Sequence, residues 1–222
     1  KSIMKITAII PAATVAILGG LLSFNAAAHA LWLESDKGET ATSKLYFGEY
    51  AEDKRETSPG KLDNIVQPTV AVIDANGTEK SVEASRENNY FAIPGGGATV
   101  LVQALKQPIR EPQGENPAPV LRRFLYARLG NGGSLPLDIH NSDNLLRLSF
   151  QGKPVPKAEV VIVAPNGWEK HLRTDEKGEV ALAVLEPGLY VVEAKHELIN
   201  PGNFEGKAYG VESHKVTLSI YK

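Results

Sequence analysis

Apolar and polar residues alternate along most of this chain with the period of two that a β-strand gives, and no segment shows a convincing helical period. In the first half we expect strands at residues 31–34, 43–50, 69–74, 80–84, 90–93, 98–105 and 121–129, the last being also compatible with a short helix. In the second half we expect them at residues 145–150, 158–164, 168–173, 179–185, 189–197 and 211–221. Short strands separated by turns are typical of antiparallel β-sandwiches, so the predicted fold is all-β.

Glycine- and proline-rich segments mark the predicted turns. Asn76-Gly77 predicts a tight hairpin, because both residues tolerate the positive φ of a primed turn. The Pro-Gly-Gly-Gly segment at 94–97 predicts a second hairpin between its flanking strands, and it lacks the Lys-Ser/Thr pair of a phosphate-binding loop. Residues 51–64 and the proline-rich residues 107–119 are expected to be surface loops.

An Asn-Gly-Gly-Ser segment at 131–134 interrupts the strand pattern, and we expect a domain boundary near it. We therefore expect two antiparallel β-sandwich domains, at residues 29–131 and 132–222, after a signal peptide at 1–28.

The signal peptide is predicted from three features of the N-terminal segment. Lys1 and Lys5 form a positive region, residues 6–24 are apolar, and alanines at 26–28 fit the small-residue cleavage pattern. The alternative is an uncleaved membrane anchor, because the apolar run is about long enough to span a bilayer. A proline and two glycines within the run favour cleavage, which would place the mature protein in the periplasm with no remaining membrane span.

Composition excludes several function classes. The formal net charge is -2 and the sequence has no basic stripe, so we expect no nucleic-acid partner. The absence of cysteine excludes disulfides, thiolate metal sites and a cysteine nucleophile. Neither a Gly-x-Ser-x-Gly elbow nor a His-Glu-x-x-His motif is found, so the chain is not expected to be an enzyme.

Three turns of the second half carry a family resemblance. They are the Gly-Lys-Pro-Val-Pro segment at 152–156, the Thr-Asp-Glu-Lys-Gly segment at 174–178 and the Glu-Pro-Gly-Leu-Tyr segment at 186–190. Together they resemble the transthyretin-like and carboxypeptidase-regulatory-like sandwich modules of secreted proteins. This resemblance implies a fold and says little about function.

A second resemblance covers almost the whole mature chain. The His-Ala-Leu-Trp-Leu-Glu segment at 29–34 and the Tyr-Phe-Gly-Glu segment at 46–49, followed by the module above, look like the NikM-like family of bacterial periplasmic proteins. The resemblance implies a periplasmic accessory in the handling of nickel, cobalt or another metal. The chain lacks the additional transmembrane helices of a transporter subunit, so we expect a membrane transporter or outer-membrane receptor to be its partner.

Two histidines of the last predicted strands are the main candidate metal ligands. His196 and His214 each lie on the more apolar face of an expected strand. If these strands form a hairpin centred near Glu205, the two histidines are direct cross-strand partners, with Cβ atoms roughly 4.5–5.5 Å apart. The connecting loop is long, and a slip of two residues would keep both histidines on one face.

His29 is the third candidate, and its role depends on the cleavage site. Cleavage after Ala28 makes His29 the first residue, whose α-amino group and imidazole would form a histidine brace with one further histidine, an arrangement that suits Cu(II). Cleavage after Ala30 removes it. Glu212 shares the parity of His214, whereas Glu193 does not, so Glu212 is the expected oxygen ligand.

The sequence therefore predicts a periplasmic accessory protein that captures or delivers Cu(II) or Ni(II) through His29, His196, His214 and Glu212. The simpler interpretation is that these histidines are hydrogen-bonded structural residues. Under that interpretation the protein is a structural, adhesive or receptor-bound envelope protein without metal. A copper oxidase with a histidine brace is a third alternative. His140 and His171 are expected to be surface residues.

Overall fold

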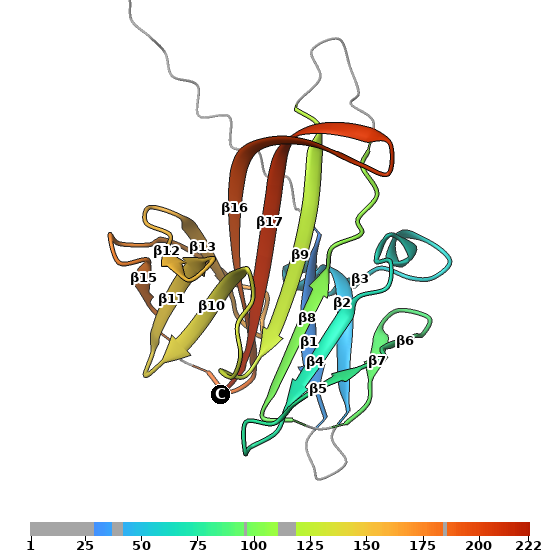
Figure 1. Ribbon diagram of the computed structural model, residues 1–222. Coiled ribbons are helices and arrows are strands. Elements are labelled where there is room, and N and C mark those ends of the chain that lie inside the picture. The colour runs from blue at the N-terminus through green and yellow to red at the C-terminus, as the bar shows by residue number, and fades with distance from the viewer. Residues whose placement is uncertain (1–28, 37–41, 96, 111–118, 184–185) are drawn as a thin grey trace, which may run out of the picture.

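The computed structural model describes residues 29–36, 42–95, 97–110, 119–183 and 186–222 (Figure 1). The predicted signal peptide and residues 111–118 of the predicted proline-rich loop lie outside this part of the chain. The described residues form strands in three sheets and two short 3-10 helices, which confirms the all-β prediction. Neither helix is long and apolar enough to cross a membrane.

A central sheet of eight strands organises the molecule. Their order across the sheet is β14 (Glu169–Arg173), β13 (Glu159–Val163), β16 (Leu189–Phe204), β17 (Lys207–Tyr221), β9 (Leu121–Leu129), β8 (Thr99–Ala104), β4 (Thr69–Ile73) and β5 (Glu79–Val82). Every neighbouring pair is antiparallel except β17 and β9, which are parallel. The prediction of purely antiparallel pairing was wrong at that pair, because no short turn joins two strands so far apart in sequence.

Two smaller sheets pack against the central sheet. The first, called the β1 sheet, contains β1 (Ala30–Ser35), β2 (Ser43–Glu49), β7 (Phe91–Ile93), β6 (Ser85–Arg86) and β3 (Lys54–Arg55). The second, called the β10 sheet, contains β10 (Leu137–Ser142), β11 (Leu145–Phe150), β12 (Lys153–Pro154) and β15 (Glu179–Ala181).

The two smaller sheets cover opposite faces of the central sheet, and alternate residues of β9 show this directly. Leu125 and Ala127 lie in a core with Leu31 of the β1 sheet, whereas Tyr126 lies in a second core with Leu137 of the β10 sheet. Successive side chains of a strand point to opposite faces, so one strand serves both cores. The molecule thus contains two β-sandwiches that share one sheet, and this sheet crosses from residues 29–131 into residues 132–222.

The expected hairpin around the Pro-Gly-Gly-Gly segment was wrong. β7 pairs with β2 in the β1 sheet, whereas β8 pairs with β4 and β9 in the central sheet. Alternation fixes which residues are buried but does not fix the partner strand. At Gly97 a Cβ would lie 2.5 Å from the Val72 side chain, so a residue without a side chain is needed where the chain passes between the sheets.

Two segments contain structure that the polarity pattern did not predict. The expected loop at 51–64 includes β3, the end of the 3-10 helix Tyr50–Glu52 and the whole of the 3-10 helix Lys61–Asn64, in which Leu62 is fully buried. β10 was missed because its sequence mixes polar with apolar residues. Its Asp138 is buried beside Arg128 of β9, with 3.1 Å between the carboxylate and the guanidinium Nε. Polarity predicts exposure only where no buried partner neutralises the charge.

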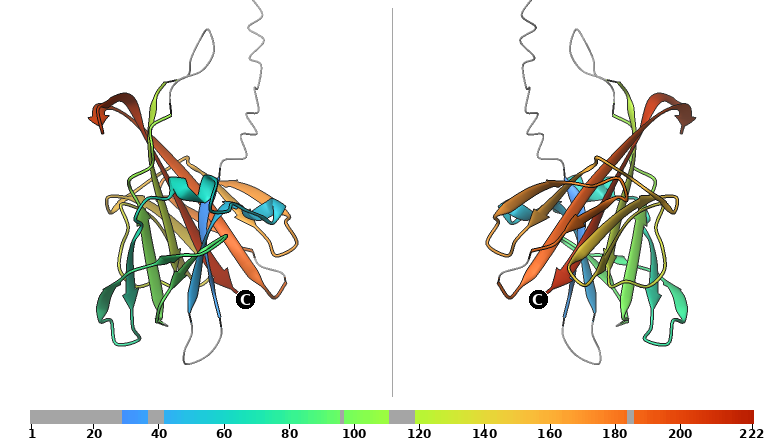
Figure 2. Two further views of the ribbon diagram at one scale, coloured as in Figure 1. Left: turned by 90° about the vertical axis from the view of Figure 1, so that its right-hand side faces the viewer. Right: turned by 90° about the vertical axis from the view of Figure 1, so that its left-hand side faces the viewer.

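The last hairpin confirms the predicted histidine register. β16 and β17 pair along their length, and His196 lies directly opposite His214. A bulge between Ile199 and Gly202 absorbs the difference between the expected and the observed turn. The hairpin extends beyond both smaller sheets (Figures 1 and 2). β13 pairs with β16 only at residues 191–194, so among the described residues the outer edge of β16 has no partner strand from Lys195 onward.

Candidate functional site

The His196–His214 pair lies on the face of the central sheet that the β10 sheet covers. Phe150, the last residue of β11, packs against both imidazole rings, with ring centroids 4.8 Å from His196 and 4.9 Å from His214. His214 is buried, whereas His196 is partly exposed. The pair therefore has one inner and one outer imidazole.

The inner imidazole is held by two aromatic residues of β9. Phe124 stacks on the His214 ring at 4.5 Å between centroids and 8° between planes. The Tyr126 hydroxyl lies 3.0 Å from Nδ1 of His214, at hydrogen-bond distance. These contacts hold one face of the ring and its Nδ1 edge, and they leave Nε2 as the nitrogen that could bind a metal ion. Among the described residues, Nε2 is buried and has no hydrogen-bond partner.

Glu212 supplies the carboxylate nearest to that nitrogen. Its Oε2 lies 3.5 Å from His214 Nε2, an ion-pair distance that lacks hydrogen-bond geometry, and its Oε1 accepts a 3.4 Å hydrogen bond from the Tyr209 hydroxyl. Glu193 instead pairs with Lys215 at 2.8 Å. The structure thus brings together three of the four predicted ligands, His196, His214 and Glu212, in one region of the hairpin.

Burial keeps both histidines neutral near pH 7. Desolvation lowers the pKa of His196, and desolvation also lowers the pKa of His214 despite the opposing effect of Glu212. Desolvation raises the pKa of Tyr126 beyond its ordinary value, so the hydroxyl beside Nδ1 stays protonated. A neutral imidazole with an unused nitrogen is the form that binds a metal ion.

A pocket of about 540 Å³ opens beside His196. It is lined by His196 and Phe150, by apolar residues of the turn after β11, and by charged residues; the charged ones are Lys153, Lys157, Lys195 and Glu197. The outer imidazole is therefore accessible to a small molecule, whereas the inner one is buried and does not line the pocket.

His29 lies in a separate cluster of charged side chains. Its Nδ1 is 3.4 Å from Glu49 of β2, and its Nε2 contacts the carboxylate of Glu56, just after β3. Lys54 pairs with Glu49 at 2.9 Å. The pairing of β1 and β3 with β2 on either side of Gly48 brings these residues together. Both carboxylates have lowered pKa values, Glu49 chiefly through Lys54 and Glu56 through His29 against its own desolvation.

The central sheet separates His29 from the other two histidines. β1 contacts β17 through odd-numbered residues, since the Thr217 hydroxyl donates to Leu31 O at 2.6 Å and Leu33 N donates to the Ser219 hydroxyl at 3.2 Å. His214 is even-numbered and points to the opposite face. The three histidines of the predicted metal site are thus divided between two places, and the predicted brace is not formed by the described residues. In the described part of the chain, no group of three or more His, Cys, Asp or Glu side chains is arranged to hold a metal ion.

The remaining histidines have structural surroundings. His171 is exposed and lies 3.1 Å from both Glu159 and Glu169, as expected of a surface residue. His140 is only partly exposed and contacts Asp138 at 3.0 Å and Arg128 at 2.8 Å. It is therefore part of the buried ion-pair cluster of β9 and β10 rather than a plain surface residue.

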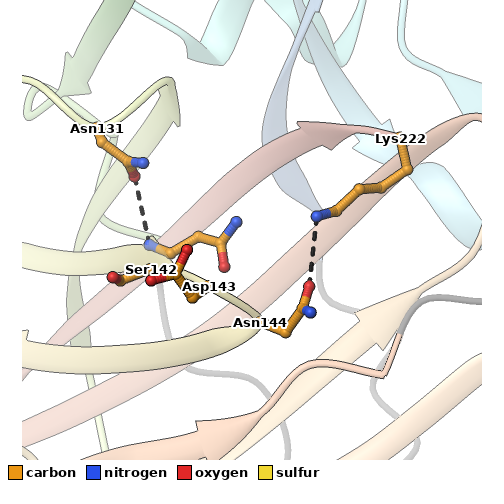
Figure 3. Close-up of a pocket in the computed structure, with 6 residues that line it drawn as sticks. Asn131, Ser142, Asp143, Asn144 and Lys222 are labelled. Carbon is orange, nitrogen blue, oxygen red and sulfur yellow. Dashed lines mark hydrogen bonds between the residues drawn. The ribbon is translucent and has the colours of Figure 1, made fainter.

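A second pocket, of about 510 Å³, lies at the turn between β10 and β11 (Figure 3). Its lining is polar, and two of its side chains already bond to their neighbours: Asn131 accepts from Asn141 N at 3.3 Å, and Lys222 donates to Asn144 at 3.4 Å. It contains one carboxylate, Asp143, and no histidine, which makes it a weaker candidate than the His196–His214 region.

Sequence reasoning missed three residues that shape these sites: Tyr126, Phe150 and Glu56. Tyr126 reaches His214 only because β9 pairs with β17, which no local pattern indicates. Glu56 reaches His29 only because β1 and β3 both pair with β2, and no local pattern indicates that arrangement either.

Comparisons with known proteins add little to this picture. No family model matches the chain, and a search of curated proteins finds no match. One similar solved structure is a two-domain fibronectin type-III segment from chicken tenascin, at 12% sequence identity and a TM-score of 0.25. The alignment covers 86% of this chain and 97% of the tenascin segment. A tetra-tandem repeat in the extending region of a large adhesion protein covers 87% of this chain at 14% identity and a TM-score of 0.22, and the chain spans about half, 49%, of its length. Such TM-scores carry no argument about fold or function.

Proposed function

We propose that this protein is a periplasmic metal-binding accessory that captures or delivers Cu(II) or Ni(II), with His196, His214 and Glu212 as the ligands. The observation that carries the proposal is the buried Nε2 of His214, which has no hydrogen-bond partner among the described residues and lies 3.5 Å from a Glu212 oxygen. An unpaired buried nitrogen is costly, and a bound metal ion would remove that cost.

The donor set suits a divalent transition metal. Two imidazoles and one carboxylate are ligands that Cu(II), Ni(II) and zinc accept in proteins. With the metal on Nε2 of His214, Nδ1 would carry the proton and donate it to the Tyr126 hydroxyl oxygen. That hydrogen bond would orient the ring, as outer-shell partners do at many metal sites.

Binding requires a rearrangement of the outer imidazole. His196 is the direct cross-strand partner of His214, and it is partly exposed beside an open pocket. A change of its rotamer would bring its ring nitrogen toward Nε2 of His214 without moving the backbone. The buried histidine would then form the fixed part of the site and the exposed one its entry.

The resemblance to NikM-like proteins supports the metal-handling role and the periplasmic location. Under this proposal the signal peptide is cleaved and the ion passes to or from a membrane transporter or outer-membrane receptor. His29, beside Glu49 and Glu56, would stabilise the start of β1 rather than bind the same ion.

A structural or adhesive role is the second candidate, and one observation favours it. Ile199 is 90% exposed on the part of β16 whose outer edge has no partner strand among the described residues. An exposed edge with an apolar side chain is a site where another strand can pair.

Metal titration of the purified 29–222 chain tests the proposal. Native mass spectrometry and calorimetry should show one Cu(II) or Ni(II) ion per chain, with affinity reduced by about tenfold or more in His196→Ala and Glu212→Gln, because each removes a direct ligand. His171→Ala removes an exposed histidine and should leave the affinity unchanged. Absence of tight binding in both the 29–222 and the 31–222 chains would sink the proposal.

A further inference from the structure

The polar pocket at the turn between β10 and β11 lies far from the histidine pair. Its volume is about 510 Å³, within the range typical of small-molecule sites. Lys222, which lines the pocket, lies roughly 26 Å from His214 along the last strand at the usual rise per residue. A ligand in this pocket would therefore not touch the proposed metal ligands.

The ends of three strands bring the lining residues together. Asn131 lies just after β9, and Lys222 lies just after β17. Asn141 and Ser142 are the last two residues of β10. The side chains of Asn131 and Lys222 approach the pocket from opposite sides (Figure 3).

The turn residues of the β10–β11 hairpin complete the lining. Ser142 pairs with Leu145 at the end of this hairpin. Asp143 and Asn144 therefore form the turn by themselves, and both have a positive φ, 48° and 67°. Aspartate and asparagine adopt this backbone region more readily than most residues do. The turn thus holds one carboxylate and one amide at the pocket.

The lining can form hydrogen bonds in both directions and carries no net charge. It consists of three asparagine amides, one serine hydroxyl, one carboxylate and one ammonium group. Amides and hydroxyls both donate and accept hydrogen bonds. All of the lining residues are polar or charged, whereas most small-molecule sites are lined mainly by apolar side chains. The pocket therefore does not suit an apolar ligand.

Several of these groups have no partner within the described part of the protein. The Ser142 hydroxyl and the Asp143 carboxylate form no hydrogen bond or ion pair with any described residue. The buried Oδ1 of Asn141 also has no hydrogen-bond partner there. A half-turn about χ2 exchanges Oδ1 and Nδ2 of this amide, so either atom can face the pocket. Polar groups left unsatisfied around one cavity favour a ligand that has many hydrogen-bonding groups.

We propose that this pocket binds a neutral saccharide. A saccharide has a hydroxyl on most of its carbon atoms, and an asparagine amide can accept from one hydroxyl of a neighbouring pair while it donates to the other. The Asp143 carboxylate would accept a charge-assisted hydrogen bond from a further hydroxyl. The opposite charges of Asp143 and Lys222 balance, which matches a ligand without net charge. The inference does not rest on the proposed metal site, because the two sites share no residue.

Nuclear magnetic resonance of the asparagine side chains tests this proposal. The probes are maltose, cellobiose, lactose and methyl α-mannoside, added to the isotope-labelled 29–222 chain without metal. At least one sugar should bind with a dissociation constant of about 1 mM, because each hydrogen bond to a hydroxyl replaces one to water. It should shift the side-chain amide resonances of Asn131, Asn141 and Asn144. The amide of Asn76, exposed in the turn between β4 and β5, should not shift, and cyclohexanol, with its single hydroxyl, should shift none of them.

Two substitutions in the lining provide the matched variants. Asp143→Gly removes the carboxylate at a position where glycine adopts the positive φ freely, and Asn141→Ala removes the amide with the unpartnered oxygen. Each should weaken sugar binding about tenfold, because each removes direct hydrogen bonds. Asn76→Ala removes an exposed amide from another hairpin turn and should retain the affinity of the parent chain. Thermal unfolding followed by circular dichroism checks that the variants fold.

The outcomes separate a saccharide site from the alternatives. Absence of shifts with all four sugars overturns the proposal. Equal affinity of the parent chain, Asp143→Gly and Asn141→Ala also overturns it, because the sugar then binds elsewhere. Tighter binding of free glycine than of any sugar overturns it too, because it shows a site for a zwitterion between Asp143 and Lys222. His196→Ala should bind the sugar like the parent chain, so failure of the metal proposal leaves this one standing.

Discussion

The side chain of His214 shows how one residue combines the requirements of a packed core with those of a ligand. Its ring is stacked on Phe124, and its Nδ1 is at hydrogen-bond distance from Tyr126, so it is as constrained as a core aromatic residue. Its second nitrogen nevertheless has no hydrogen-bond partner among the described residues. A purely structural role would favour phenylalanine at this position, since that side chain has no polar atom to satisfy.

The burial of His214 makes stability depend on pH. Desolvation lowers its pKa in the folded chain below the value of about 6.5 in the unfolded chain, so the unfolded state binds more protons between the two values. The contribution of the neutral His214 ring to the stability of the fold is therefore complete above about pH 6.5, and it is lost as pH falls through the lowered pKa. His196 acts in the same direction.

Urea unfolding of the metal-free protein at about pH 7.5 and about pH 5 measures this dependence. His214→Phe should reduce the loss of stability on acidification. His171→Ala should not reduce it, because hydrogen bonding to Glu159 raises the pKa of His171 and gives that residue the opposite sign. An unchanged pH dependence in His214→Phe would contradict the assignment.

At the scale of elements, glycines decide where strands approach one another. Gly48 is the β2 residue that pairs with Ala30 of β1 on one side and with Arg55 of β3 on the other. Its φ of +156° is unfavourable for other residues, and a Cβ there would lie 2.0 Å from the backbone oxygen of Lys54. The approach of β3, and with it the position of Glu56 beside His29, depends on the missing side chain.

Replacement of Gly48 by alanine should therefore destabilise the fold by about 1–3 kcal/mol, through backbone strain and the forced movement of β3. Gly210→Ala is the matched control in β17, because a Cβ there would meet no atom within 4 Å. Thermal unfolding followed by circular dichroism compares the two variants. Equal midpoints for Gly48→Ala and Gly210→Ala would show that β3 shifts without cost.

At the scale of the whole molecule, the parallel pair of β9 and β17 joins the two halves. β17 lies between β16 of the second half and β9 of the first, and it pairs with β9 from Val211 to Ser219. Buried Arg128 of β9 adds an ion pair to Asp138 of β10. Removal of either half would expose one face of the central sheet and leave a buried charge without its partner.

Separate expression of residues 29–131 and 132–222 tests this dependence. Neither piece should unfold cooperatively on its own, because each lacks strands that cover its core, and mixing the two should restore a cooperative transition. Hydrogen exchange of the amides of β9 and β17 measures the effect, with protection expected only in the mixture and in the intact chain. Full protection of either piece alone would show two independent domains.

The sequence by itself determined the strands and most of the turns, because both follow from local rules. Alternation assigned the faces of β16 and β17 and predicted the pairing of His196 with His214, since a single hairpin connects them. The hairpin at Asn76-Gly77 was predicted for the same reason, and β4 does pair with β5. Gly77 has the expected positive φ of 82°, whereas Asn76 does not have a positive φ, so the tight primed turn was wrong in that detail.

Only the tertiary structure decided which distant segments meet. It placed β9 beside β17, Tyr126 beside His214, and His29 beside Glu49 on the other face of the sheet. It also separated β7 from β8, which the sequence had predicted to be a hairpin. The physical reason is that periodicity encodes the face to which a side chain points, whereas the partner strand is selected by the packing of the whole core.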